Sequence, residues 1–156
     1  MEKYLLTSMQ QGILFDCLKS PSEGYYIQQL VCTFPKGLDA DIIREAWKQS
    51  VKANKVLRTR FCTDDSGDIL QFFDEEKSFQ FNILDGDTFD KDTFLSKQRS
   101  AKIDILNDNL WSVTLVCSKE KTEMIWCFHH IILDGRSHSL ILEDVFRYYN
   151  SGSFSK

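Results

Sequence analysis

Several features that mark particular classes of protein are missing from this chain of 156 residues. No window approaches the roughly 18 consecutive apolar residues of a membrane-spanning helix, and the N-terminus lacks the apolar stretch of a signal peptide. The net charge is −4, and the basic residues form no extended cluster. Binding to nucleic acid or to an anionic membrane requires such a cluster. We therefore expect a cytoplasmic protein with no nucleic-acid or membrane partner.

The cysteines do not follow the pattern of a disulfide framework. There are five, an odd number, and no two have C-x-x-C spacing. Most lie inside apolar runs, which favours buried free thiols in a reducing compartment. Histidine is also scarce, and besides the adjacent His129 and His130 only His138 remains as a third ligand. The sequence therefore predicts no metal site.

Apolar and aromatic residues, in contrast, are plentiful enough for a packed core. Hydrophobic residues make up 42% of the chain and charged residues 27%, and there are twelve Phe, five Tyr and three Trp. This is ordinary globular composition, and the length suits one domain. We expect that domain to cover residues 1–150, followed at 151–156 by a tail or the start of a linker.

Hydrophobic periodicity predicts an α/β (α+β) sandwich, a mixed β-sheet with flanking helices. Asp39 is the expected cap of the clearest helix, and Trp111, Val113, Leu115 and Cys117 are expected to share one face of a strand. The predicted helices cover residues 8–18, 39–53, 88–103 and 137–149. The predicted strands cover residues 25–34, 56–62, 69–73, 79–83, 111–117 and 124–130.

Two histidines stand at the end of the last predicted strand. Neighbouring strand residues point to opposite faces, so His129 and His130 should meet different surroundings. Asp134 falls in the turn before a helix, and Gly135 permits a tight bend there. A histidine held near a carboxylate suits a general base. The alternative is a pair of hydrogen-bonded core histidines followed by a helix-capping aspartate, and the residues alone leave both open.

The segment His129-His130-x-x-x-Asp134-Gly135 resembles the HHxxxDG signature of condensation domains from nonribosomal peptide synthetases. Two further segments resemble the family's first two motifs in the right order: Ser8-Met9-Gln10-Gln11-Gly12-Ile13-Leu14-Phe15 and Leu57-Arg58-Thr59-Arg60-Phe61. The resemblance covers roughly residues 4–150. Two departures are Ala53-Asn54-Lys55, where the family usually has Arg-His, and Arg136, where Trp often follows the glycine.

The resemblance implies a fold and a reaction. Condensation domains resemble two chloramphenicol-acetyltransferase-like lobes with the active site in the tunnel between them, and this chain resembles the N-terminal lobe alone. In the complete domain, donor and acceptor peptidyl carrier proteins deliver phosphopantetheine-tethered substrates, and an amine attacks a thioester to form an amide. No cofactor would be bound directly. The isolated lobe should be inactive without its C-terminal partner lobe, and its bared apolar surface could drive dimerisation.

The resemblance also assigns roles to individual residues. His130 would be the catalytic histidine, either as a general base or by positioning the amine. His129 would be structural, Asp134 would form an ion pair with Arg58, and Gly135 would leave the tunnel backbone accessible.

Alternatives without a catalytic role stand beside these assignments. Arg58 could pair on the surface, and Gln10 and Gln11 are expected on the surface of their helix. The chain as a whole could instead be a non-catalytic docking or structural module, or an acyltransferase that uses a free coenzyme A thioester.

Overall fold

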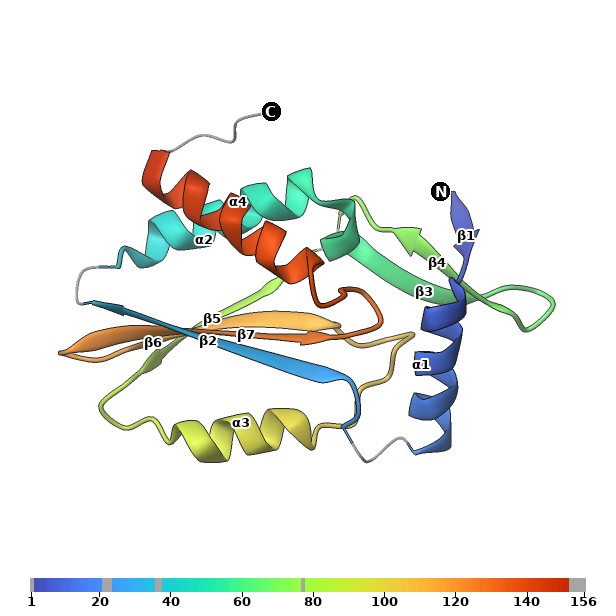
Figure 1. The fold of residues 1–156 in the computed structure, drawn as a ribbon, viewed down its shortest axis with the longest axis horizontal. Coiled ribbons are helices and arrows are strands. Elements are labelled where there is room, and N and C mark those ends of the chain that lie inside the picture. Colours follow the sequence, from blue (N-terminus) through green and yellow to red (C-terminus); the bar gives the residue numbers. More distant parts are fainter. Residues whose placement is uncertain (1, 21–23, 36–37, 77, 152–156) are drawn as a thin grey trace.

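A four-stranded mixed sheet forms the centre of the protein (Figure 1). Its strands lie in the order β2 (Ile27–Pro35), β7 (Lys121–His129), β6 (Trp111–Cys117) and β5 (Gln80–Asp85). The pairs β2–β7 and β7–β6 are antiparallel, whereas β5 pairs with β6 in parallel. The computed structural model describes residues 2–20, 24–35, 38–76 and 78–151.

A second, three-stranded antiparallel sheet stands at one end of the first. Its order is β1 (Lys3–Leu5), β4 (Ile69–Phe73) and β3 (Thr59–Thr63). The turn between β3 and β4 depends on two residues. Gly67 has a φ of +90°, a left-handed conformation that glycine adopts without steric cost, and the Asp64 carboxylate accepts backbone N–H groups within the turn.

Helices cover both faces of the large sheet (Figure 1). The helices α2 (Ala40–Ala53) and α4 (Ser137–Ser151) pack together over one face, and α3 (Lys91–Arg99) lies over the other. The helix α1 (Ser8–Lys19) stands at the end of the sheet, next to the point where β7 leads into α4. Among the described residues, no helix is long and apolar enough to cross a membrane.

Strand alternation divides the apolar side chains between two clusters. Trp111, Val113 and Leu115 belong to the main core with Trp47 of α2, and the rings of Trp47 and Trp111 lie 5.7 Å apart. On β7, Ile125 points the other way and joins a smaller cluster with residues of α3. The predicted α/β architecture with a mixed sheet is confirmed, and so is the shared face of β6.

Element boundaries agree with the sequence except in a few places. Asp39 caps α2 as predicted, through bonds from the N–H groups of residues 41 and 42. Lys55–Arg58 form a short 3₁₀ helix rather than the start of a strand, because the fully buried Leu57 turns inward and its carbonyl accepts the Trp111 indole N–H at 2.8 Å. The short strand β1 was not predicted, and residues 152–156 of the predicted tail lie outside the described residues.

All five cysteines are free thiols, as predicted. Only Cys127 is buried; the other four are partly exposed, so the expectation of buried thiols is wrong for them. Cys17, Cys62 and Cys117 lie near the ends of α1, β3 and β6, and Cys32 lies on β2, the edge strand of the large sheet. An apolar stretch of sequence still meets solvent at these places.

Candidate active site around the paired histidines

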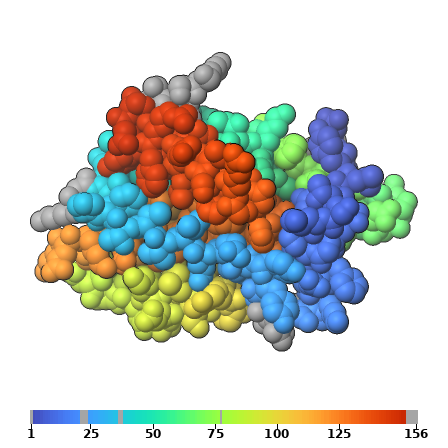
Figure 2. Space-filling view, in the orientation of Figure 1, coloured from blue at the N-terminus to red at the C-terminus, as the bar shows by residue number. Residues whose placement is uncertain are grey.

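The two histidines stand where β7 ends and the chain turns toward α4. His129 is the last residue of β7 and lies opposite Ile27 of β2. Residues 130–132 form a turn, and α4 begins at Ser137. In the space-filling view, the dark blue atoms of the N-terminal segment lie against the orange atoms of this region (Figure 2).

His129 is a buried, neutral histidine. Its side chain is 2% exposed, and Nδ1 accepts the Ile131 backbone N–H at 3.1 Å. A ring nitrogen that accepts carries no proton, so Nε2 carries it and donates to Sγ of Cys17 at 3.5 Å. Burial, with a smaller contribution from His130, lowers the pKa of His129 from 6.5 to about 4. At neutral pH His129 therefore adds no positive charge beside its neighbour.

His130 has the opposite tautomer. Its backbone N–H donates to the Tyr26 carbonyl at 2.8 Å, and its Nδ1 is bonded to the Leu133 carbonyl. A carbonyl only accepts, so Nδ1 carries a proton, and in the neutral ring Nε2 therefore has the lone pair. The side chain is half-buried, in contrast to His129, which confirms that the two histidines meet different surroundings.

Asp134 caps the N-terminus of α4. Its Oδ1 accepts the backbone N–H groups of Arg136 at 3.0 Å and Ser137 at 2.7 Å. These hydrogen bonds, above all the one from Ser137, lower the pKa of the Asp134 carboxyl. The sequence left open whether this aspartate caps a helix, and its hydrogen bonds are those of a helix cap.

Gly135 stands in the turn before α4, but not in a conformation that requires glycine. Its φ is not positive, unlike those of Gly24 and Gly67, so the bend that the sequence predicts at Gly135 is one that other residues could also adopt. A Cβ at Gly135 would meet nothing within 4 Å. The space beside Gly135 is therefore open.

Arg58 is buried, but its partner is Glu75. The predicted ion pair with Asp134 is therefore wrong. Two contacts explain the difference: the Asp134 carboxylate is bonded to the start of α4, and the Arg58 carbonyl accepts the N–H of Asp74, which places Arg58 beside the loop after β4. Arg58 lines a cavity of about 400 Å³ there, together with Lys48 and Lys52 of α2.

Gln10 was expected on the surface of its helix, and its position contradicts that expectation. Its amide is hydrogen-bonded on every side: Oε1 accepts the N–H of Thr7 at 3.0 Å, and the amide exchanges two hydrogen bonds with Gln71 of β4, at 2.9 and 3.1 Å. Nε2 also donates to the Ile131 carbonyl at 3.1 Å. Gln10 thus connects α1 to the small sheet and to the histidine turn.

Cys17 and Gln10 reach the histidine turn from the same face of α1. They are seven residues apart, which is two helical turns, so the spacing was visible in the sequence. The sequence contained no sign that this face of α1 meets the end of β7. The two contacts join residues that are separated by 112 and by 121 positions in the chain.

Tyr26 connects α1 to His130 by a different route. It has a φ of +69°, a left-handed conformation that is strained for a residue with a side chain. Its hydroxyl donates to Asp16 of α1 at 2.6 Å, while its carbonyl accepts the His130 N–H. Contacts at both ends therefore hold Tyr26 in place.

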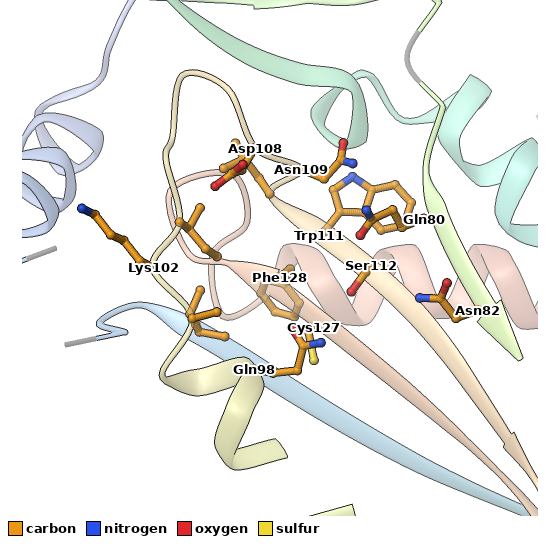
Figure 3. A pocket seen from close by; sticks show the side chains of 14 residues that line it. Gln80, Asn82, Gln98, Lys102, Asp108, Asn109, Trp111, Ser112, Cys127 and Phe128 are labelled. Atoms are coloured by element: carbon orange, nitrogen blue, oxygen red, sulfur yellow. The ribbon is translucent and has the colours of Figure 1, made fainter. Parts of the chain in front are cut away.

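A separate cavity of about 260 Å³ lies beside the large sheet, and neither His129 nor His130 lines it. Figure 3 shows its polar side chains: Gln80 and Asn82 on β5, Ser112 on β6, Gln98 at the end of α3, and Asn109 on the loop before β6. Nothing in the sequence pointed to these residues as a group.

Comparison with known proteins identifies the family. The family model described as "Condensation domain" matches residues 1–154. A linear gramicidin synthase of Brevibacillus parabrevis is 30% identical over 156 residues, covering 95% of this chain and 2% of that protein. Bacitracin synthase 1 of Bacillus licheniformis is 28% identical over 154 residues, covering 94% of this chain and 3% of that protein.

Solved structures share the fold at low sequence identity. The starter condensation domain of rhizomide synthetase RzmA superposes with a TM-score of 0.90 at 16% identity, covering 100% of this chain and 40% of that one. The first condensation domain of the CDA synthetase gives a TM-score of 0.80 at 19% identity, covering 99% and 43%. The chain thus spans less than half of each of these structures and a few per cent of the two synthases. It belongs to the condensation domain family of nonribosomal peptide synthetases.

Proposed function

We propose that this chain is the N-terminal lobe of a condensation domain that joins carrier-protein-bound aminoacyl or peptidyl thioesters by forming an amide bond, with His130 as the catalytic residue. The proposal rests on the family and on one observation, the tautomer of His130. Its Nδ1–H is bonded to the Leu133 carbonyl, which leaves the lone pair on Nε2. That nitrogen is the atom that can accept a proton or a hydrogen bond from an amine.

The proposed reaction uses this lone pair. The acceptor amine attacks the donor thioester carbonyl, a C–N bond forms, and the C–S bond breaks. The amine loses a proton and the departing thiolate gains one; Nε2 of His130 either carries this proton or holds the amine by a hydrogen bond. The neutral state of His129 helps in the first case, because a cation beside His130 would disfavour a protonated His130.

Asp134 and Gly135 support the site without touching the substrate in this proposal. Asp134 caps α4 and so shapes the segment that follows His130. Gly135 leaves open space beside the backbone, which fits the expectation that it keeps the tunnel accessible. Arg58 would support the small sheet through Glu75 rather than the histidine turn.

The partners follow from the same assignment. Donor and acceptor peptidyl carrier proteins would deliver the phosphopantetheine-tethered substrates, and a C-terminal lobe would supply the other wall of the tunnel. The chain covers 40% of the rhizomide synthetase structure, which leaves room for such a lobe. We expect the chain alone to be inactive, because one lobe cannot exclude water or orient two thioesters.

The direct test measures amide formation from two loaded carrier proteins, with this chain, with a separately supplied C-terminal lobe, and with both. We expect product only from the mixture of both lobes. His130→Ala should abolish it, while His138→Ala, which alters a partly exposed histidine on α4, should leave most of the activity.

Two results would contradict the proposal. Product from the mixture that contains His130→Ala would remove the histidine from the mechanism. No product from folded lobes in any combination would favour the alternative, a non-catalytic docking or structural module.

A further inference from the structure

We propose that helix α1 is the positioning element of the catalytic histidine, with Gln10, Asp16 and Cys17 as positioning residues. All three contact the histidine segment or Tyr26, which is bonded to that segment, and none is expected to touch substrate. The inference rests on the proposed function only in taking His130 as catalytic. The contacts themselves are those of this chain.

The first contact is made at Ile131, the residue after His130. Its N–H donates to Nδ1 of His129, and its carbonyl accepts from Nε2 of Gln10. Both polar backbone groups of Ile131 are thus held by side chains. The N–H bond fixes the peptide between His130 and Ile131, and the carbonyl bond fixes the next peptide along the chain. Because the Gln10 amide is also bonded to Thr7 and Gln71, it cannot rotate without breaking those bonds.

The second contact holds the ring of His129 in place. The Ile131 N–H can only donate, so it makes Nδ1 the acceptor, and Nε2–H of His129 is left to donate to the sulfur of Cys17 at 3.5 Å. Burial raises the pKa of the Cys17 thiol, so the sulfur stays neutral beside the neutral ring. The thiol therefore gives Nε2–H a partner and supports the tautomer that the turn sets.

The third contact acts through Tyr26. The Asp16 carboxylate accepts the Tyr26 hydroxyl, and the Tyr26 carbonyl accepts the N–H of His130 itself. A left-handed φ at a non-glycine residue is strained and persists only where surrounding contacts maintain it. Tyr26, the strained residue, is bonded directly to His130. Backbone strain that helps to position a catalytic side chain is expected next to that side chain.

Together the three contacts hold residues 129–131 from one helix. They fix the backbone on both sides of the His130 side chain, whose own Nδ1–H bond to Leu133 depends on the same turn. If the turn shifts, that bond lengthens and Nδ1 no longer holds the proton in preference to Nε2. The lone pair at Nε2 would then be lost from a fraction of the molecules.

The experiment measures the histidine tautomers by nitrogen NMR of this chain, which requires no activity. In the wild type we expect the proton on Nδ1 of His130 and on Nε2 of His129. Gln10→Glu keeps the size of the side chain but cannot donate to Ile131, and we expect a mixture of His130 tautomers. The matched control is Gln11→Glu on the same helix, whose side-chain bond goes to the Leu6 carbonyl at 3.4 Å; it should match the wild type.

A second pair of variants tests the same inference without altering Gln10. Asp16→Asn keeps an acceptor for the Tyr26 hydroxyl, and Asp16→Ala removes it. We expect hydrogen exchange of the His130 amide to be roughly tenfold faster in Asp16→Ala, as losing a charge-assisted bond would cause, and close to the wild type in Asp16→Asn. This pair decides the question if Gln10→Glu fails to fold.

Activity provides a separate readout in the two-lobe mixture. A misplaced His130 should lower kcat roughly 10- to 100-fold in Gln10→Glu and leave KM unchanged. The inference is overturned if folded Gln10→Glu and Asp16→Ala keep the wild-type tautomers and amide exchange. An inactive wild-type mixture would count against the proposed function alone, because the NMR result does not depend on it.

Discussion

Single residues at this site act through tautomer and charge. His129 and His130 are adjacent and chemically identical, yet one has its proton on Nε2 and the other on Nδ1. The difference comes from the partner of each Nδ1, an N–H in the first case and a carbonyl in the second. Only the second arrangement leaves Nε2 able to accept.

The burial of His129 should make stability depend on pH. Its pKa is about 4 in the folded protein against 6.5 in the unfolded chain, so the unfolded state binds the proton more tightly. The free energy of unfolding should therefore fall as the pH drops from 6.5 to 4, by about 1.4 kcal/mol per pH unit and roughly 3 kcal/mol in total from this residue. Above pH 6.5 His129 should have no effect on the pH dependence.

Urea denaturation across this range, for the wild type and His129→Asn, measures the effect. Carboxylates such as Glu123 titrate equally in both proteins, so the difference between the two slopes isolates the histidine. Equal slopes in wild type and His129→Asn would show that His129 is not held neutral.

Among the elements, α1 and the start of α4 determine the geometry of the histidine segment. The two helices hold it from opposite ends: α1 through residues 10, 16 and 17, and α4 through its cap at Asp134. The strand β7 alone does not determine this geometry, because the strand ends at His129 and the segment continues beyond it.

Two substitutions at Asp134 distinguish a helix cap from an ion pair. Asp134→Ala should lower the free energy of unfolding by about 1 kcal/mol, the usual cost of losing an N-cap. Asp134→Asn should recover most of this loss, because Asn caps nearly as well as Asp. Chemical denaturation of the three proteins measures both changes. An Asn variant as unstable as the Ala variant would instead indicate that the negative charge matters, as an ion pair requires.

The elements themselves were largely predictable, because hydrophobic periodicity and capping residues act locally. Thr7 and Asp39 cap α1 and α2, and Trp111–Cys117 form a strand with the predicted buried face. The exceptions have tertiary causes. Residues 55–58 form a 3₁₀ helix that buries Leu57 against Trp111, and β1 forms only because β4 offers an edge to a short segment.

In the molecule as a whole, a patch of exposed apolar residues marks one end. Leu5, Phe15 and Leu18 are 65–77% exposed and line one cavity between β1 and α1. A monomeric protein seldom leaves several large apolar side chains together in water. Nothing among the described residues covers the patch. It therefore fits the expectation that an exposed apolar surface could drive self-association.

We predict that the chain dimerises through this patch. Phe15→Ser combined with Leu18→Ser should shift sedimentation toward the monomer, because each substitution removes apolar area from the interface. Leu140→Ser is the control, since Leu140 is also exposed but lies on α4. A wild-type protein that stays monomeric at high concentration would rule out the dimer.

The sequence by itself determined the fold class, the family and which two histidines to examine as the candidate site. Strand and helix periods and the HHxxxDG spacing are local properties of the chain, so they can be read without the tertiary structure. Tertiary structure decided which residues meet. Arg58 pairs with Glu75 and not with Asp134, and Gln10 is partly buried and bonded to the histidine turn. These contacts join positions far apart in the chain, and each polar group takes the partner that the packing of strands and helices brings within reach.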